Sequence, residues 1–220
     1  MLDDHQGSSI SADVAARPAT AADLPSLPAR PALIDIFNLR LHKPKFGLPI
    51  SVAAHGVQCA TLALRAGVDE ETVFACLVHD IGLGLIRADH GWWGAQLLEP
   101  YVSERVAWGI RYHQALRFYA DREAGYAYPE LYVRMFGADY QPPEYIAAAY
   151  RHARNHPWYG HARQITLFDD YGFDTSAPFS LEPFIDIIGR HFRQPAEGLG
   201  NDASATAHMW RTIIEPNKLL

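Results

Sequence analysis

The chain has 220 residues, 49% hydrophobic and 20% charged, which is enough for one domain with a sizeable core. Its net charge of −6 argues against a general nucleic-acid-binding protein, because phosphate neutralisation requires a basic surface. Two cysteines exclude a disulfide-rich secreted scaffold. No apolar segment approaches the roughly 20 residues that cross a bilayer, and the first residues lack the pattern of a signal peptide. We therefore expect a cytoplasmic protein that binds neither nucleic acid nor membrane.

Residues 1–31 are expected to form a flexible N-terminal arm, followed by one helical domain over residues 32–220. The arm is rich in Ala, Ser and Pro and shows no sustained apolar periodicity. Such a segment buries too little surface to offset the entropy of ordering, unless it lies on the domain or on a partner chain. An oligomer therefore stays open as an interpretation.

Helical periodicity dominates the chain after the arm. The segment 50–65 has apolar residues at helical spacing and stops at Gly67, a residue suited to the position after a helix. Asp69 is the predicted N-cap of the next helix, which runs to His79-Asp80. Strand patterns bounded by tight turns are scarce, so we predict an all-α fold packed as an orthogonal helical bundle. Further helices are predicted over residues 91–98, 103–119, 142–154, 158–171, 181–192 and 203–214, with mixed character over 120–141.

Eleven histidines occur in the chain, and several lie where they can converge. His55 lies within the first of these two helices and His79-Asp80 ends the second. A tight turn at Gly67 makes the two helices an αα-hairpin, which brings His55 near His79-Asp80. The later candidates come from other helices, an arrangement that suits a metal site in a bundle core. These later candidates are His90, His113, Asp169 and Asp170.

Nitrogen and oxygen ligands without thiolate suit iron, manganese, cobalt, nickel or zinc more than soft metals. In an adjacent His-Asp pair, the imidazole can bind one ion while the carboxylate spans two ions about 3.5–4 Å apart. Two divalent ions with two carboxylates would leave a positive site that attracts anionic substrates. Each histidine alone is better explained as a core side chain bonded to a carbonyl, so the prediction of a metal site depends on the set. Cys59 and Cys76 are interpreted as small apolar core residues.

The run from His55 to His79-Asp80-Ile81-Gly82 resembles the HD-domain superfamily of metal-dependent proteins. Members carry a His, then His-Asp, then a late Asp on an α-helical core, and most are phosphohydrolases. The resemblance covers about residues 46–171. It implies a helical bundle of the HD type with a metal site in its core.

A closer resemblance is to the mixed-valent di-iron oxygenases of this superfamily, which include myo-inositol oxygenase and enzymes that cleave phosphonates. His55-Gly56-Val57-Gln58 is similar to their His-x-x-Gln at the first ligand. His90 precedes Gly94-Ala95, as their third ligand precedes Gly-Ala. The fourth ligand segment, His-x-x-x-Lys-x-Tyr, is similar to the sequence at His113, and Phe168-Asp169-Asp170 is similar to the segment of the last ligand.

This resemblance implies six metal ligands, with Asp80 bridging two ions. Asp80 and Arg117 are the predicted catalytic residues. Arg117 is also expected to hold a carboxylate or phosphonate bidentately, with an ion pair to Asp121 as the alternative. Tyr119 and His161 are further candidates for substrate binding, and a solvated helix end is the alternative for His161. The implied ligands are His55, His79, Asp80, His90, His113 and Asp169, with Asp170 as the alternative to Asp169.

Two departures from these patterns affect the predicted reaction. Leu83 occupies the position after His-Asp-x-Gly where many HD proteins carry Lys or His, which weakens the phosphohydrolase interpretation. Residues 45–49 lack the Tyr and Glu that gate iron in the phosphonate oxygenases, so gating and substrate are expected to differ.

The first hypothesis is a dinuclear non-haem iron oxygenase that acts on a small polar, anionic substrate by C–H abstraction, with Fe(II)/Fe(III) and molecular oxygen. The alternative is a metal-dependent phosphohydrolase of a phosphate ester or nucleotide, with Mn, Mg or Zn as further metals. A non-enzymatic binding module is the third hypothesis.

Overall fold

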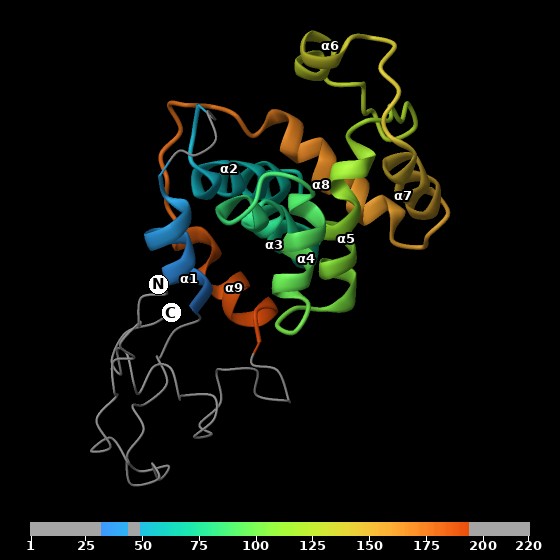
Figure 1. Ribbon diagram of the computed structural model, residues 1–220. Coiled ribbons are helices and arrows are strands. Elements are labelled where there is room, and N and C mark those ends of the chain that lie inside the picture. Colours follow the sequence, from blue (N-terminus) through green and yellow to red (C-terminus); the bar gives the residue numbers. More distant parts are fainter. Residues whose placement is uncertain (1–31, 44–48, 194–220) are drawn as a thin grey trace, which may run out of the picture. The chain divides into compact units, whose positions relative to one another are not determined.

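The computed structural model describes residues 32–43 and 49–193 (Figure 1). Within these ranges the chain forms helices joined by loops, and an isolated antiparallel bridge pairs Asp121 with Tyr126. The all-α prediction is therefore confirmed. None of the described helices has the length and apolar character of a membrane span. The predicted arm 1–31 and helix 203–214, and most of the 45–49 segment, lie outside the described residues.

The described residues form twelve helical elements, nine of them α-helices. They are, in chain order, α1 (Ala32–Asp35), the π-helix η3 (Ile36–Leu41), α2 (Val52–Arg65), α3 (Glu70–Val78), the 3-10 helix η4 (Ile81–Gly84), α4 (His90–Leu98), α5 (Glu104–Leu116), α6 (Glu130–Phe136), α7 (Glu144–Arg154), α8 (Tyr159–Tyr171), the 3-10 helix η5 (Glu182–Phe184) and α9 (Ile185–His191).

The ends of the central helices follow local rules. Ser51, Asp69 and Ser103 cap α2, α3 and α5, and each side chain accepts a hydrogen bond from the backbone N–H three residues on. Gly67 has a φ of +71°, the left-handed conformation that turns the chain from α2 into α3. The sequence pattern predicts these boundaries because each cap depends on neighbouring residues.

One predicted boundary is wrong, and one helix is not predicted. Helix α5 ends at Leu116 instead of continuing to residue 119, because Tyr126 folds back and donates a hydrogen bond from its hydroxyl to the Arg117 carbonyl at 3.1 Å. The prediction misses helix α6 inside the mixed region 120–141, because this helix is only seven residues long and none of them is buried.

The core packs around the α2–α3 hairpin, with α5 and α8 against it (Figure 1). A Cβ atom on Gly56 would overlap the carbonyl oxygen of Leu77, so only glycine permits this close approach of α2 to α3. Phe74 of α3, Ile110 of α5 and Ile165 of α8 are fully buried. The close packing fixes the backbone from which the candidate site residues project.

Candidate metal centre

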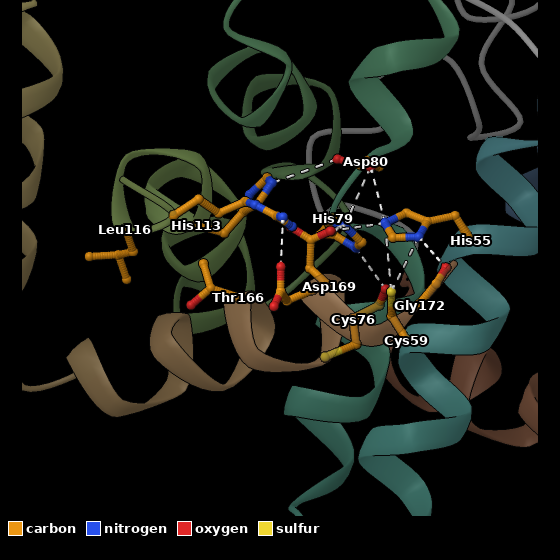
Figure 2. Close-up of polar contacts among 12 residues, drawn as sticks. His55, Cys59, Cys76, His79, Asp80, His113, Leu116, Thr166, Asp169 and Gly172 are labelled. Carbon is orange, nitrogen blue, oxygen red and sulfur yellow. Dashed lines mark hydrogen bonds and ion pairs between the residues drawn. The ribbon is translucent and has the colours of Figure 1, made fainter. Parts of the chain in front are cut away.

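The structure brings all six predicted metal ligands together in one cluster, most of which Figure 2 shows. They come from α2, the end of α3, the first turn of α4, α5 and α8. All are buried except His90, whose side chain is 17% exposed. The cluster consists of His55, His79, Asp80, His90, His113 and Asp169.

The two carboxylate oxygens of Asp80 divide the four histidines into two pairs. Oδ2 lies 3.5 Å from the Nε2 atoms of both His55 and His79. Oδ1 lies 3.0 Å from Nε2 of His90 and 3.6 Å from Nε2 of His113. This arrangement is suited to a carboxylate that bridges two ions, one beside each pair of imidazoles.

Asp169 completes the first of these pairs. Its Oδ1 atom lies 3.1 Å from His55 Nε2 and 3.7 Å from His79 Nε2. Asp170, the alternative last ligand, instead accepts a hydrogen bond of 3.2 Å from Arg117. The structure therefore turns Asp169 toward the histidines and engages Asp170 with the arginine.

Each histidine of the cluster has its Nδ1 atom near a backbone carbonyl oxygen. The distances are 2.7 Å from His55 to Gly172, 2.8 Å from His79 to Cys76, and 2.6 Å from His113 to Ile110. His90 lies 3.4 Å from the Arg87 carbonyl. A carbonyl only accepts, so Nδ1 carries the proton and the Nε2 lone pair points into the cluster.

The donor set fits metal cations. Nε2 of His79 and of His113 are buried and have no hydrogen-bond partner among the described residues. A buried ring nitrogen without a hydrogen-bond partner is costly, and a metal ion bound to the neutral imidazoles would satisfy both atoms. Three overlapping groups have ligand atoms within 4.8 Å of one another. These groups are His79, His113 and Asp169; Asp80, His90 and His113; and His55, Cys59 and His79.

The electrostatics of the cluster favour positive charge. Burial raises the pKa of the Asp80 carboxyl, but the charges of His79 and His90 outweigh burial and hold this pKa well below its usual range. Burial lowers the pKa of His79, whereas Asp80 and Asp169 raise it, and the net value is about 9. Protons on the imidazoles or metal ions at Nε2 would supply the charge that the two carboxylates attract.

Both cysteines are fully buried, and the predicted core role agrees with their burial. Cys59 Sγ also lies 3.7 Å from each ring nitrogen of His55. Burial is the main reason that the pKa of the Cys59 thiol is raised well above its usual value. The thiol is therefore protonated and packs beneath His55.

The segment after α8 supports His55 in a way that the sequence analysis did not detect. Gln58 holds this segment with two hydrogen bonds to the backbone of Asp174, at 2.6 and 2.7 Å. Phe173 stacks on the His55 ring, with ring centroids 4.4 Å apart. The Gly172 carbonyl accepts a hydrogen bond from Nδ1 of His55. A side chain on Gly172 would overlap Cys59 Sγ. The Gln in the His-x-x-Gln motif therefore acts through this segment.

Arg117 is buried and engaged by carboxylates. One guanidinium nitrogen forms a very short ion pair with Asp169 and another bonds Asp170, while the Tyr132 ring lies 5.1 Å from the guanidinium carbon. Asp121, the alternative partner, instead accepts a hydrogen bond from the Tyr159 hydroxyl. The charge of Arg117 helps to hold the pKa of the Asp169 carboxyl well below its usual range, against the opposing effect of burial.

Two predicted substrate-binding residues lie away from the cluster. Tyr119 follows the end of α5 and stacks on Tyr150 of α7, with ring centroids 3.9 Å apart. His161 lies about two turns before Asp169 on α8, roughly 12 Å along the helix axis. Its Nδ1 atom bonds the Thr72 hydroxyl at 2.8 Å. Neither residue lines the pocket over the cluster.

A pocket of about 310 Å³ opens over the cluster, with Asp80, His90 and Asp169 among its lining residues. Its polar walls come from Arg87, Gln114 and Arg117. Its apolar walls come from Leu83, Phe118, Phe173 and four residues of α6, namely Leu131, Tyr132, Met135 and Phe136.

Two comparisons with known proteins agree with this geometry. A curated relative from Leisingera caerulea is named [1-hydroxy-2-(trimethylamino)ethyl]phosphonate dioxygenase (glycine-betaine-forming). It is 33% identical over 95 residues, which cover 38% of this chain and 48% of the relative, so the chain spans about half of that relative's length. The family model described as HD domain matches residues 52–168. Since this match covers more than half of the sequence, the chain belongs to the HD-domain family, as its resemblance predicted.

Proposed function

We propose that this protein is a dinuclear HD-type metalloenzyme that uses iron and molecular oxygen to oxidise a small anionic substrate. The observation that carries the proposal is the division of four imidazoles into two pairs by the carboxylate of Asp80. A structural histidine cluster has no need of Nε2 lone pairs that converge on one bridging carboxylate.

The ligands fall into two sets around Asp80. One ion would be held by His55, His79 and Asp169 with Oδ2 of Asp80, and the other by His90 and His113 with Oδ1. Bound iron would supply the redox chemistry by which oxygen is reduced and a C–H bond of the substrate is broken. Manganese, magnesium or zinc at the same ligands would supply Lewis-acid chemistry instead.

The protein's own groups prepare the site. The four backbone carbonyls hold the imidazoles with Nδ1 protonated, so little reorganisation is needed when a ligand binds. Arg117 fixes one oxygen of Asp169 and leaves the other directed at His55. Two divalent ions would exceed the two carboxylates by two charges, which favours an anionic substrate.

Two observations favour oxidation over hydrolysis. The pocket walls are mainly apolar and aromatic, with Leu83, Phe118 and Phe173 around the cluster, and such walls exclude water from reactive species. The relative that matches part of the chain is named as a phosphonate dioxygenase. A phosphohydrolase would need water beside the ions and gives the opposite results in the experiment below.

The experiment begins with metal analysis of protein purified without oxygen and loaded with Fe(II). We expect two irons per chain and a mixed-valent EPR signal after partial oxidation. Oxygen uptake is then measured with [1-hydroxy-2-(trimethylamino)ethyl]phosphonate, other hydroxyphosphonates and small polyols, and p-nitrophenyl phosphate hydrolysis is measured with manganese or magnesium.

Asp80→Asn should abolish both iron binding and oxygen uptake, whereas the matched variant Asp186→Asn, at an exposed position on α9, should retain both. Phosphate-ester hydrolysis without substrate-dependent oxygen uptake would establish the phosphohydrolase instead. A protein that binds no metal under either condition would refute both enzymatic interpretations.

A further inference from the structure

Two arginines line the pocket over the cluster, and their surroundings differ. Arg117 is buried and its guanidinium is neutralised by Asp169 and Asp170. Arg87 is exposed, and its guanidinium has no ion pair or hydrogen bond with any residue in the ranges 32–43 and 49–193. The pocket therefore contains one arginine whose charge is already engaged and one whose charge is open to a ligand.

The backbone places Arg87 close to the cluster. Its carbonyl oxygen accepts from Nδ1 of His90 at 3.4 Å, three residues further along the chain. Asp80 and His90 line the same pocket as Arg87. A ligand that contacts this guanidinium can thus extend from the mouth of the pocket to the metal ligands.

We infer that Arg87 is the specificity-determining residue that recognises a terminal oxyanion of the substrate, a phosphonate, phosphate or carboxylate group. A guanidinium donates two parallel hydrogen bonds to such groups, and an unpaired one at a pocket mouth selects against cationic ligands. The inference rests on the proposed function, because it assumes that the pocket leads to a loaded metal centre. Arg117, which the sequence analysis favoured for this role, holds Asp169 instead.

The size and lining of the pocket restrict the substrate further. About 310 Å³ accommodates only a small molecule, and the apolar walls offer little to a second charged group away from the cluster. The substrate class is therefore a small molecule with one terminal oxyanion and a polar group that reaches the metals.

The test is a calorimetric titration with methylphosphonate, acetate and methylammonium, without oxygen, on both iron-loaded and iron-free protein. We expect the oxyanions to bind and methylammonium not to bind. Arg87→Gln should weaken oxyanion binding about tenfold to a hundredfold, because a charge-assisted hydrogen bond is lost. Arg87→Lys should lie in between, and the exposed control Arg40→Gln should bind like the wild type.

The outcomes separate this inference from the proposed function. Both glutamine variants should keep the wild-type iron content, since substitution at position 87 leaves its backbone carbonyl in place for His90. Unchanged oxyanion affinity in Arg87→Gln, an equal loss in Arg40→Gln, or no binding to either form of the wild type would overturn the inference. Missing iron or missing oxygen uptake would refute the proposed function alone, since the iron-free titration still decides the role of Arg87. Methylphosphonate binding more tightly than acetate would identify a tetrahedral oxyanion, and the reverse a carboxylate.

Discussion

Helices α2, α3, α4, α5 and α8 carry the cluster and contain buried residues, whereas α6, which lines the pocket above it, contains none. Val73, Cys76 and Ile110 in the cluster-bearing helices are fully buried. In α6 no residue is buried, and the pocket-lining residues Leu131 and Met135 are 45% and 57% exposed. The ligand set is thus preorganised by the core, whereas α6 depends on few contacts. The core therefore fixes the ligands, and α6 contributes four residues to the wall of the pocket.

The largest expected effect falls on the cluster itself and compares two adjacent carboxylates. Asp169→Asn should lose most of its bound iron, because loss of even an outer partner of a ligand reduces metal affinity roughly 10–100-fold. Asp170→Asn should retain the iron, since its carboxylate bonds Arg117 and not the histidines. Iron content after gel filtration measures both. Equal loss of iron in the two variants would contradict the choice of Asp169 over Asp170 as the last metal ligand.

The packing between α2 and α3 predicts the next largest effect, on stability. Gly56→Ala would force a methyl group against the Leu77 carbonyl and should lower the free energy of unfolding by about 3 kcal/mol. Gly160→Ala, in α8, meets no atom within 4 Å and should be neutral or stabilising by up to about 1 kcal/mol. Urea denaturation of both variants checks the contrast. A small loss of unfolding free energy in Gly56→Ala would show that the contact between α2 and α3 can relax. The core would then be less rigid than its contrast with α6 implies.

His161 ties α8 to α3 and α5 and gives the tightly packed region a pH dependence. It bonds Thr72 and lies against Gly109, and burial lowers its pKa to about 4. The unfolded histidine has a pKa of about 6.5, so between these values the unfolded chain binds more protons. The stabilising contribution is complete above pH 6.5 and is lost as the pH falls toward 4, by about 1 kcal/mol per pH unit.

Replacement by Asn, which retains a donor near the position of Nδ1, should remove this part of the acid sensitivity. The measurement is the free energy of unfolding at pH 7, 6 and 5 for wild type and His161→Asn. The two curves should diverge as the pH falls, with the wild type losing more stability. Parallel curves would show that the histidine takes up its proton in the folded state.

Half of the cluster could be predicted from local signals, whereas His90, His113 and Asp169 are assigned through the resemblance to HD-domain motifs. Helical periodicity, the cap at Asp69 and the turn at Gly67 define a hairpin, and the hairpin brings His55 to His79-Asp80. The assignment of Arg117 illustrates the limit of such reasoning. Its pairing with Asp121 assumed that α5 continues past residue 117, but the helix ends at Leu116 and the arginine meets Asp169 from α8.

The backbone groups that orient the imidazoles of the cluster could not be predicted from the sequence. Gly172, Cys76, Ile110 and Arg87 hold the imidazoles through backbone carbonyls, and every residue has a carbonyl. The side chain at such a position therefore gives no signal. Helix α6 escaped prediction for a different reason, since seven residues between Pro129 and Gly137 are too few for a clear helical period.

The smallest effect on stability is expected in α6, and a matched pair of leucines tests the comparison directly. Leu77→Ala in α3, at 2% exposure, should cost about 2–5 kcal/mol because it leaves a cavity in the core. Leu131→Ala in α6 should change the free energy of unfolding by less than about 0.5 kcal/mol and leave the iron content unchanged. Because Leu131 lines the pocket, the same variant should still alter methylphosphonate affinity several-fold in the calorimetric titration. If Leu131→Ala instead released iron or destabilised the fold as Leu77→Ala does, α6 would belong to the structural core and the contrast between the two regions would fail.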